Sequence, residues 1–328
     1  MLSRPLGNTE LMASNVVFGA WAIGGWKWGG TDADESIAAI RAALDAGVNC
    51  IDTAAVYGFG LSEQLVGQAI KGYAREEILL ATKCGLRWDI ETPALHAESE
   101  GKRIFRTLSR DSIHWEVDQS LQRLGTDYID LYQTHWSDPN TPADEVLETF
   151  DELMKSGKVR AVGFCNSSAE DLASGGAKVG FASDQEKYSL LDRERDADNL
   201  PVVEDYGLSF LAYSPLAQGL LTGAVTHDRQ FSNTDLRTGN PRFSATSRTR
   251  VAKVTQAINI IAKDHGVSTG QAVLAWTLQQ PGVSHVLAGT RNVEQAKHNA
   301  AAGDVVLGQD ALAAITEAAN QFEGFEST

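Results

Sequence analysis

The chain has 328 residues, 43% of them hydrophobic, with a net charge of −15 and a pI near 4.9. This length allows one large α/β domain or two smaller domains. The acidic balance disfavours nucleic acid and anionic membranes as partners, so an anionic ligand would need a locally basic pocket.

The chain opens with a segment that lacks the continuous apolar run of a signal peptide. The turn residues Gly7-Asn8-Thr9 predict a β-hairpin that caps one end of the fold. Short apolar runs then alternate with amphipathic segments. The expected strands lie at 16–20, 49–52, 77–83, 128–135, 159–164, 181–185, 208–214 and 284–289. Helical spacing of apolar residues predicts helices at 35–47, 62–73, 110–125, 143–157 and 268–282, and another beginning near residue 292.

Eight expected strands, each followed by a helix or loop, indicate repeated βα units in a parallel sheet buried on both faces. A doubly wound sheet would have a dinucleotide-binding glycine turn early in the chain. GAWAIGG (19–25) lacks that spacing, and GFGLSE (58–63) lacks the third glycine. We therefore expect a (β/α)8 TIM barrel, as one domain over residues 1–328. Two insertions without strong periodicity, at 84–108 and 217–247, would be long loops on the C-terminal face.

Cysteine usage and hydropathy bear on the compartment. Cys50, Cys84 and Cys165 have no CxxC spacing, which predicts reduced thiols and neither a disulfide framework nor a zinc site. No apolar stretch approaches the roughly 18 residues that a membrane span needs. We expect a cytoplasmic protein without membrane partners.

Four titratable side chains lie at or just after successive expected strands. Asp52 ends the second strand, and Tyr57 lies in the loop that follows it. Lys83 ends the third strand and His135 the fourth. Singly, they could be a capping acid, a loop aromatic, a solvated charge and a packed histidine. Because the active site of a barrel forms at the C-terminal ends of its strands, together they predict one pocket.

The four side chains suit proton transfer to a carbonyl oxygen. A phenol has an ordinary pKa near 10. We expect the Lys83 ammonium to lower the pKa of Tyr57, and Asp52 to hold Lys83 and balance its buried charge. His135 could hydrogen-bond the reacting oxygen. Hydride would have to come from a nicotinamide cofactor.

Six ordered segments resemble the aldo-keto reductase superfamily over nearly the whole chain. They are IDTAAVYGFGLSE (51–63), ATKCGL (81–86), GTDYIDLYQTHW (125–136), GKVRAVGFCNSS (157–168), YSPLAQGLLTG (213–223) and GTRNVEQAKHN (289–299). WAIGGWKWGG (21–30) and IDLYQTHW (129–136) are further similar to a bacterial NADPH-dependent branch, distantly related to potassium-channel β subunits. The resemblance implies a (β/α)8 barrel that binds NADPH/NADP without a Rossmann unit and reduces an aldehyde or ketone to an alcohol.

The resemblance also implies roles for individual residues. Tyr57 would be the general acid, Lys83 and Asp52 the pair that tunes it, and His135 the residue that orients the carbonyl. Asn166 and Gln185 would hold the nicotinamide carboxamide, with Tyr213 stacked on the ring. The full set implied to bind cofactor is Trp21, Asn166, Gln185, Tyr213, Ser214, Leu216, Gln218, Gly219, Gly289, Thr290, Arg291, Gln295 and Asn299. In two departures from the usual pattern, Cys165 replaces a serine and Gln295 an arginine.

Arg291 has a physical basis for phosphate binding besides the resemblance. It lies between the last expected strand and the helix that begins near residue 292. A helix N-terminus attracts phosphate through its free N–H groups and its dipole, and an arginine adds a planar cation. We therefore expect NADPH rather than NADH, with Arg291 at the 2′-phosphate.

Tryptophans are frequent on the expected catalytic side. Trp21, Trp26, Trp88 and Trp136 could line a pocket for sugar faces or apolar carbonyl compounds, or simply pack the barrel mouth. Another tryptophan, Trp28, lies in the same segment as Trp21 and Trp26. The insertion at 84–108 adds cations that could meet a polar or anionic substrate or be solvated: Arg87, Lys102, Arg103 and Arg106. We expect the substrate to be a sugar-, oxo-sugar- or inositol-derived carbonyl.

Other functions stay open at this point. The barrel could be an NADPH-binding regulatory subunit with slow turnover, or a general aldehyde detoxification reductase. A metal-dependent hydrolase or isomerase is disfavoured because HxH spacing is absent at the strand ends, so we expect no metal. The sequence leaves the choice between monomer and homo-oligomer undetermined.

Overall fold

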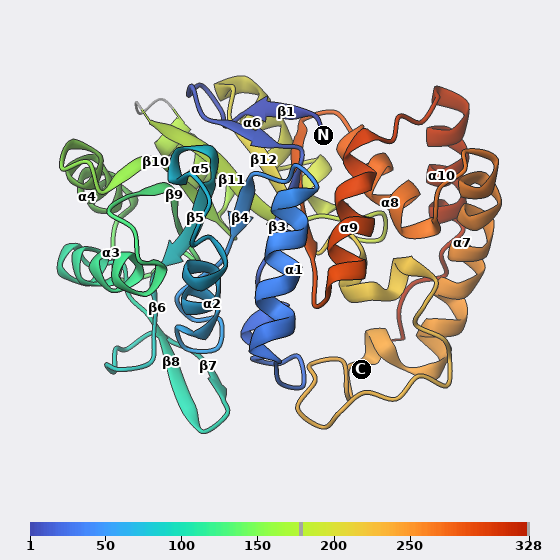
Figure 1. Cartoon of the computed structure of the whole chain (residues 1–328), viewed down its shortest axis with the longest axis horizontal. Coiled ribbons are helices and arrows are strands. Elements are labelled where there is room, and N and C mark those ends of the chain that lie inside the picture. Colours follow the sequence, from blue (N-terminus) through green and yellow to red (C-terminus); the bar gives the residue numbers. More distant parts are fainter. Residues whose placement is uncertain (177–179, 327–328) are drawn as a thin grey trace.

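A closed barrel of parallel strands forms the centre of the computed structural model, which describes residues 1–176 and 180–326 (Figure 1). Each strand pairs with the next one along the chain, and the last closes on the first. The eight strands are β3 (Val16–Gly19), β4 (Cys50–Asp52), β5 (Leu79–Cys84), β9 (Ile129–Thr134), β10 (Val159–Cys165), β11 (Phe181–Lys187), β12 (Ser209–Tyr213) and β13 (Val283–Gly289). The expected (β/α)8 barrel is confirmed, and a doubly wound sheet is excluded.

Helices surround the barrel (Figure 1). They are α1 (Ala33–Asp45), α2 (Leu61–Ala69), α3 (Arg110–Leu124), α4 (Ala143–Lys155), α5 (Ala169–Gly176), α6 (Asn199–Tyr206), α7 (Ala245–Asp264), α8 (Thr269–Leu278), α9 (Val293–Ala301) and α10 (Gln309–Asn320). The six expected helices correspond to α1, α2, α3, α4, α8 and α9. The apolar spacing of the sequence did not indicate four further helices, α5, α6, α7 and α10. In α7 the buried stripe is narrow, because most of its twenty residues are polar or small.

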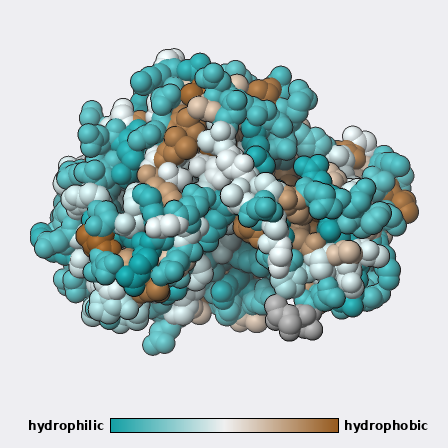
Figure 2. Space-filling model, turned by 90° about the horizontal axis from the view of Figure 1, so that it is seen from below, coloured by the Kyte–Doolittle hydropathy of each residue, from teal (hydrophilic) through white to brown (hydrophobic). Residues whose placement is uncertain are grey.

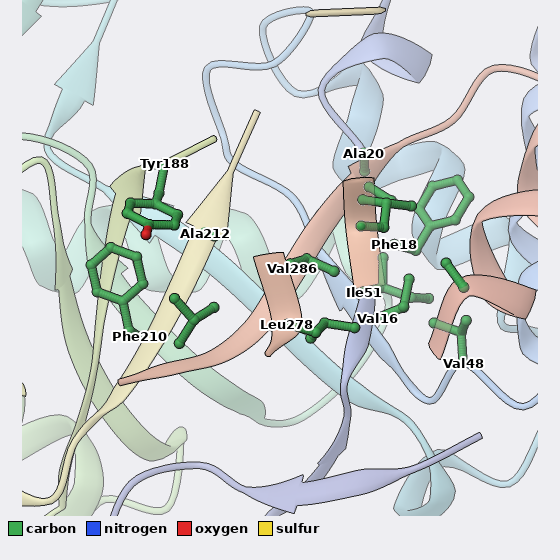
Figure 3. Close-up of a cluster of buried hydrophobic side chains, with 14 of the residues drawn as sticks. Val16, Phe18, Ala20, Val48, Ile51, Tyr188, Phe210, Ala212, Leu278 and Val286 are labelled. Atoms are coloured by element: carbon green, nitrogen blue, oxygen red, sulfur yellow. The ribbon is translucent and has the colours of Figure 1, made fainter. Parts of the chain in front are cut away.

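Successive residues of each strand point alternately into two apolar layers. Val16 and Phe18 of β3 face outward to the helices, whereas Val17 between them faces the barrel interior. Figure 3 shows the outward layer, with Val16 and Phe18 beside Ile51. The inward layer gathers apolar side chains mostly from the first three residues of the strands, so the interior of the barrel is apolar toward its N-terminal end.

A hairpin closes that apolar end. Strands β1 (Ser3–Pro5) and β2 (Met12–Ser14) pair antiparallel, as the turn residues predicted. Leu6 and Leu11 from the connecting turn pack into the inward layer. Gly7 has a φ of +53°, and a Cβ there would meet the Ala182 carbonyl oxygen at 2.4 Å, so the close approach requires glycine.

The insertion at 84–108 is more ordered than expected. Instead of a loop, it forms a three-stranded antiparallel sheet in the order β6 (Leu86–Arg87), β8 (Lys102–Arg106), β7 (Leu95–Ser99). Strands β7 and β8 project as an arm at the end of the molecule opposite β1 (Figure 1). The insertion at 217–247 is a long connection, as expected, with 3-10 turns at η4 (Ala217–Thr222) and η5 (Pro241–Phe243).

Three further expectations concern the described part of the chain. All three cysteines are buried and unpaired there, in agreement with reduced thiols. In the part of the chain that the structure describes, no helix is both long and apolar enough to cross a membrane. Among residues 1–176 and 180–326, no group of three or more His, Cys, Asp or Glu side chains is arranged to hold a metal ion.

Candidate active site

A buried ion pair lies inside the C-terminal half of the barrel. Lys83 Nζ is 2.6 Å from Asp52 Oδ1 and donates a second hydrogen bond of 2.9 Å to the Thr53 carbonyl. Both charged side chains are almost fully buried. Burial is the largest single effect and acts to lower the pKa of Lys83. The charge and hydrogen bond of Asp52, together with the neighbouring Tyr57 and Cys165, outweigh it and hold that pKa above its ordinary value. The amine is therefore a fixed cation neutralised by Asp52.

The second oxygen of Asp52 is also satisfied. Its Oδ2 accepts hydrogen bonds from Gln185 Nε2 at 2.8 Å and from Gln133 Nε2 at 3.4 Å. Gln185 was expected to hold a cofactor amide, but here its own amide group donates to Asp52. Gln133 was not among the expected site residues. Its position two residues before His135 could have placed it on the inward face of the strand.

Tyr57 lies over this pair. Its hydroxyl is 3.5 Å from Lys83 Nζ. The turn that follows is tight, because Gly58 has a φ of +62° and a Cβ there would meet the Gly24 carbonyl oxygen at 2.3 Å. Gly60 then caps α2, which begins one residue before the expected Ser62. The two glycines thus shape the turn that sets Tyr57 above Lys83.

Lys83 acts to lower the pKa of Tyr57, as expected, but the net pKa of Tyr57 is raised. Burial raises the pKa of Tyr57 above its ordinary value, and the Lys83 charge offsets this effect only in part. The reason is distance, since the ammonium lies closer to Asp52 than to the phenol. Tyr57 is therefore a protonated phenol at neutral pH, able to donate a proton.

His135 completes the group of four. It follows β9, and its ring lies edge-on to the Tyr57 ring with centroids 5.5 Å apart. Burial, and then the Lys83 charge, lower the pKa of His135 well below its ordinary value. The imidazole is therefore neutral at pH 7, with one ring N–H to donate. The structure brings Asp52, Tyr57, Lys83 and His135 together in one place, as the strand-end argument predicted.

A hydrogen-bonded chain of side chains continues from His135 to β12. Asn166 has a left-handed φ of +53°, and its amide donates to the His135 carbonyl at 3.0 Å. Its Oδ1 accepts from the Tyr213 hydroxyl at 2.7 Å. The Cys165 thiol lies between the two expected amide residues, 3.2 Å from Asn166 Nδ2 and 3.7 Å from Gln185 Oε1. The expected carboxamide-binding residues are thus neighbours.

The turn after β12 has an unusual backbone. Ser214, Ala217 and Gln218 have φ values of +55°, +46° and +55°, and Gly219 follows at +99°. Non-glycine residues rarely adopt this conformation. The N–H groups of Ala217 and Gly219 donate within the turn, to the carbonyls of Ser214 and Leu216 at 2.8 and 2.9 Å. With Leu216, this segment belongs to the set of residues that the resemblance implied to bind the cofactor.

The N-terminus of α9 lies next to Arg291, which was expected to bind the 2′-phosphate of the cofactor. Asn292 caps the helix by accepting from the Gln295 backbone N–H at 2.9 Å. Gln295 Oε1 in turn accepts from the Arg291 N–H at 2.9 Å. The Asn299 amide donates to Gly289 O and Thr290 Oγ1, at 3.3 and 3.2 Å. Gln295 and Asn299 therefore shape the turn, while the Arg291 side chain is exposed.

The expected tryptophans gather around Tyr57 in what we call the mouth cluster. Its aromatic members are Trp21, Trp26, Tyr57, Phe59, Trp88 and Trp136. The Trp21 ring stacks on the Tyr57 ring with centroids 6.0 Å apart, and meets Trp28 edge-on at 5.4 Å. Figure 2 views the molecule from the side on which β7 and β8 project, where pale and brown surface lies between hydrophilic lobes. A substrate carbonyl at Tyr57 would contact aromatic faces.

The cofactor residues fit the chemistry of a dinucleotide. The N-terminus of α9 and the exposed Arg291 beside it offer donors for phosphates. The Asn166 and Gln185 side chains offer amides close to Tyr57. The site combines a proton donor, a fixed cation and a neutral imidazole, which suits the protonation of a carbonyl oxygen.

Residues 15–320 of the chain match the Aldo/keto reductase family. Aldo-keto reductase YhdN of Bacillus subtilis (strain 168) is 40% identical over 292 residues, which cover 88% of this chain and 85% of that protein. The NADH-specific methylglyoxal reductase of Escherichia coli (strain K12) is 36% identical, with 98% and 100% covered. The structure of the glycerol dehydrogenase AKR11B4 from Gluconobacter oxydans superposes with a TM-score of 0.87 at 34% identity, covering 98% of this chain and 96% of that one.

Proposed function

The chain belongs to the aldo/keto reductase family, and on this premise we propose that it is an NADPH-dependent reductase of oxygen-rich aldehydes or ketones of the sugar and polyol class. Membership in this family supports an enzyme that reduces a carbonyl to an alcohol. The observation that carries the proposal is the group of Asp52, Tyr57, Lys83 and His135 beneath the mouth cluster. We also propose that residues 1–328 form one domain around this site.

In the proposed mechanism, Tyr57 is the general acid. Its hydroxyl gives a proton to the carbonyl oxygen, and the Lys83 charge favours the phenolate that remains. Asp52 keeps Lys83 in place and makes the buried pair neutral. The neutral His135 ring donates a hydrogen bond to the same oxygen and orients it. A bound nicotinamide cofactor supplies the hydride to the carbonyl carbon.

Tyr57→Phe tests the general acid. We expect kcat to fall by roughly 10²- to 10⁴-fold, the usual contribution of a positioned proton donor. The dissociation constant of NADPH, followed by its fluorescence, should change little, and Tyr206→Phe is the matched control. Loss of NADPH binding in Tyr57→Phe would contradict the assignment. A wild-type protein that binds NADPH but reduces no carbonyl in a broad panel would favour the regulatory-subunit alternative.

The choice of NADPH rests on Arg291. The exposed guanidinium stands at the N-terminus of α9, where a 2′-phosphate would gain both the charge and the helix dipole. Against this stands the relative from E. coli, which is NADH-specific at 36% identity. Arg291→Gln should raise the KM for NADPH by about 10- to 100-fold, as expected for a lost charge-assisted hydrogen bond, and leave the KM for NADH unchanged. Lys297→Gln on the same helix is the control, and a wild-type preference for NADH would overturn the proposal.

The substrate class rests on the mouth cluster and on the relatives. Tryptophan faces suit the C–H faces of sugars. Two relatives act, by their names, on glycerol and methylglyoxal, which are both small and oxygen-rich. A screen of sugars, oxo-sugars and inositol-derived ketones that follows NADPH absorbance tests the class. Full activity in EDTA is expected, and a preference for purely apolar aldehydes would favour a detoxification reductase instead.

A further inference from the structure

Three nitrogen-bearing side chains stand beside the mouth cluster and have no part in the proposed mechanism. The projecting arm supplies His96 from β7 and Arg106 from β8, and the segment after η1 (Ala22–Gly24) supplies Lys27. Arg106 Nε donates to His96 Nδ1 at 3.2 Å. The Arg106 guanidinium lies over the Trp136 ring, 5.2 Å from its centroid, and Lys27 Nζ lies 4.7 Å from the centroid of Trp26.

These side chains share a region with the reacting group. The His96 ring is 5.3 Å from that of Trp136, which directly follows His135 in the chain. Burial, and then the charges of Arg106 and Lys27, lower the pKa of His96 to about 4. His96 in turn contributes to the lowered pKa of His135. Trp136 and Tyr57 belong to the same mouth cluster, and His96 and Arg106 contact that cluster at Trp136.

All three side chains present donors. A guanidinium can only donate, so His96 Nδ1 accepts from Arg106 and the neutral ring carries its hydrogen on Nε2. Among the described residues, the Arg106 side chain donates one other hydrogen bond, to the Ser137 carbonyl at 3.4 Å. Within the described residues, no carboxylate lies within ion-pair distance of Arg106 or Lys27, although the charge of Glu100 acts on Lys27.

The neighbouring arginines behave differently. Arg87 forms a two-pronged pair with Asp89, and Arg103 pairs with Glu91 and Glu98. The chain carries 43 acidic residues against 28 basic ones, so pairing is easy to achieve. An arginine held by a histidine and an aromatic face, and left without a carboxylate, is prepared for an anion from outside the chain.

We propose that Arg106, supported by His96 and Lys27, binds the carboxylate or phosphate group of a carbonyl substrate whose reacting carbon lies at Tyr57 and His135. The ring of Trp136, which is partly exposed, covers the carbon skeleton between the two ends. This specificity rests on the proposed carbonyl reductase activity. It narrows the substrate class to anionic aldehydes and ketones, such as sugar acids or sugar phosphates.

Matched substrate pairs test the proposal on the intact enzyme. The carboxylate pair is 4-carboxybenzaldehyde and its methyl ester, and the phosphate pair is glyceraldehyde 3-phosphate and glyceraldehyde. In one of the two pairs, we expect kcat/KM to be at least about tenfold higher for the anionic substrate than for the neutral one, which is the gain typical of a charge-assisted hydrogen bond. The pair with the larger ratio of kcat/KM, anionic over neutral, shows whether the site prefers a carboxylate or a phosphate.

Variants assign the effect to Arg106. Arg106→Gln should lower kcat/KM for the anionic substrate by about 10- to 100-fold and leave the neutral one within about twofold, because a bidentate charged contact is lost. Arg106→Lys should retain part of the preference, and Arg103→Gln on the same strand is the control. Equal kcat/KM for both members of each pair in the wild type would overturn the proposal. So would an equal loss for both members in Arg106→Gln.

A binding assay separates this inference from the proposed function. The alcohol 4-(hydroxymethyl)benzoate, which is the product from 4-carboxybenzaldehyde, and its neutral analogue 4-(hydroxymethyl)benzamide can be titrated by tryptophan fluorescence, because the mouth cluster would report their binding without turnover. Tighter binding of the benzoate in the wild type, lost in Arg106→Gln, supports the anion site even where no reduction is seen. Equal binding of both alcohols argues against it, whereas absence of turnover alone argues against the reductase.

Discussion

Glu116 gives a pH-dependent stability that can be predicted in detail. It lies on α3 with 2% of its surface exposed, and its two oxygens accept from the Gly85 N–H at 2.9 Å and the Ser112 hydroxyl at 3.0 Å. Burial raises the pKa of Glu116 from its ordinary 4.5 to about 7, although both hydrogen bonds act to lower it. The folded protein therefore binds this proton more tightly than the unfolded chain.

The sign and size of the effect follow from linkage. Stability from this group is fully present below about pH 4.5 and is lost as the pH rises through about 7. A pKa difference of about 2.5 at 1.36 kcal/mol per unit gives a loss of about 3 kcal/mol, most of it between pH 5 and 8. Glu116→Gln keeps an acceptor for Gly85 but cannot ionise, so it should escape this loss.

Urea unfolding at several pH values between 5 and 8.5 measures the effect. The free energy of unfolding of Glu116→Gln, minus that of the wild type, should rise with pH by about 2 to 3 kcal/mol. Glu148→Gln, at an exposed position of α4, should show no such rise. A difference that stays constant from pH 5 to 8.5 would refute the argument that burial keeps Glu116 protonated.

Three other substitutions have expected outcomes. Lys83→Met leaves Asp52 as an unpaired buried charge, so urea unfolding should show a loss of about 3 to 5 kcal/mol that a second change, Asp52→Asn, largely restores. Gly7→Ala forces a left-handed φ and a 2.4 Å approach to a carbonyl oxygen of β11, so it should destabilise by on the order of 1 to 3 kcal/mol without changing kcat. Tyr213→Phe removes the 2.7 Å hydrogen bond to Asn166, and NADPH fluorescence titration should show binding about 2- to 10-fold weaker.

The barrel could be predicted because each of its strands carries a local signal. Its strands are buried on both faces, so they read as near-continuous apolar runs, and the expected bounds differ from the structure by two residues at most. The expected strand at 159–164, for example, is Val159–Cys165 in the structure. Strand ends at one edge of a parallel barrel must meet, which is why Asp52, Lys83 and His135 could be grouped without coordinates.

The arm escaped prediction because its strands carry almost no apolar pattern. LHAES in β7 has mostly exposed or partly exposed residues, and KRIFR in β8 buries only Ile104 and Phe105. These segments become strands through pairing with each other and through packing of Ile104 into the mouth cluster. His96 could not be connected to the site from sequence for the same reason, since tertiary pairing alone brings it beside Trp136.

The protonation of Tyr57 depends on distances that no sequence pattern carries. A lysine near a phenol lowers its pKa, and burial raises it, so the outcome depends on where the ammonium lies. Lys83 Nζ is 2.6 Å from Asp52 and 3.5 Å from Tyr57, and the carboxylate therefore compensates most of its charge. The types of residue in the site were predictable, whereas the balance between two opposing effects required the structure.

Charge is divided between two regions of the proposed site, and this division has a consequence for selectivity. At the barrel end Lys83 is neutralised by Asp52, while His135 and Tyr57 are uncharged, so a carbonyl arriving there meets hydrogen-bond donors but little net field. Among the described residues, Arg106 and Lys27 carry positive charge without a carboxylate at ion-pair distance, and they lie over Trp136 and Trp26 of the mouth cluster. An anionic substrate would thus be held by its distant end, in a partly exposed region, while the reacting end sits where charge develops only during proton transfer. Binding strength and reaction rate can then be changed independently, by substitutions on the arm and on the barrel strands respectively.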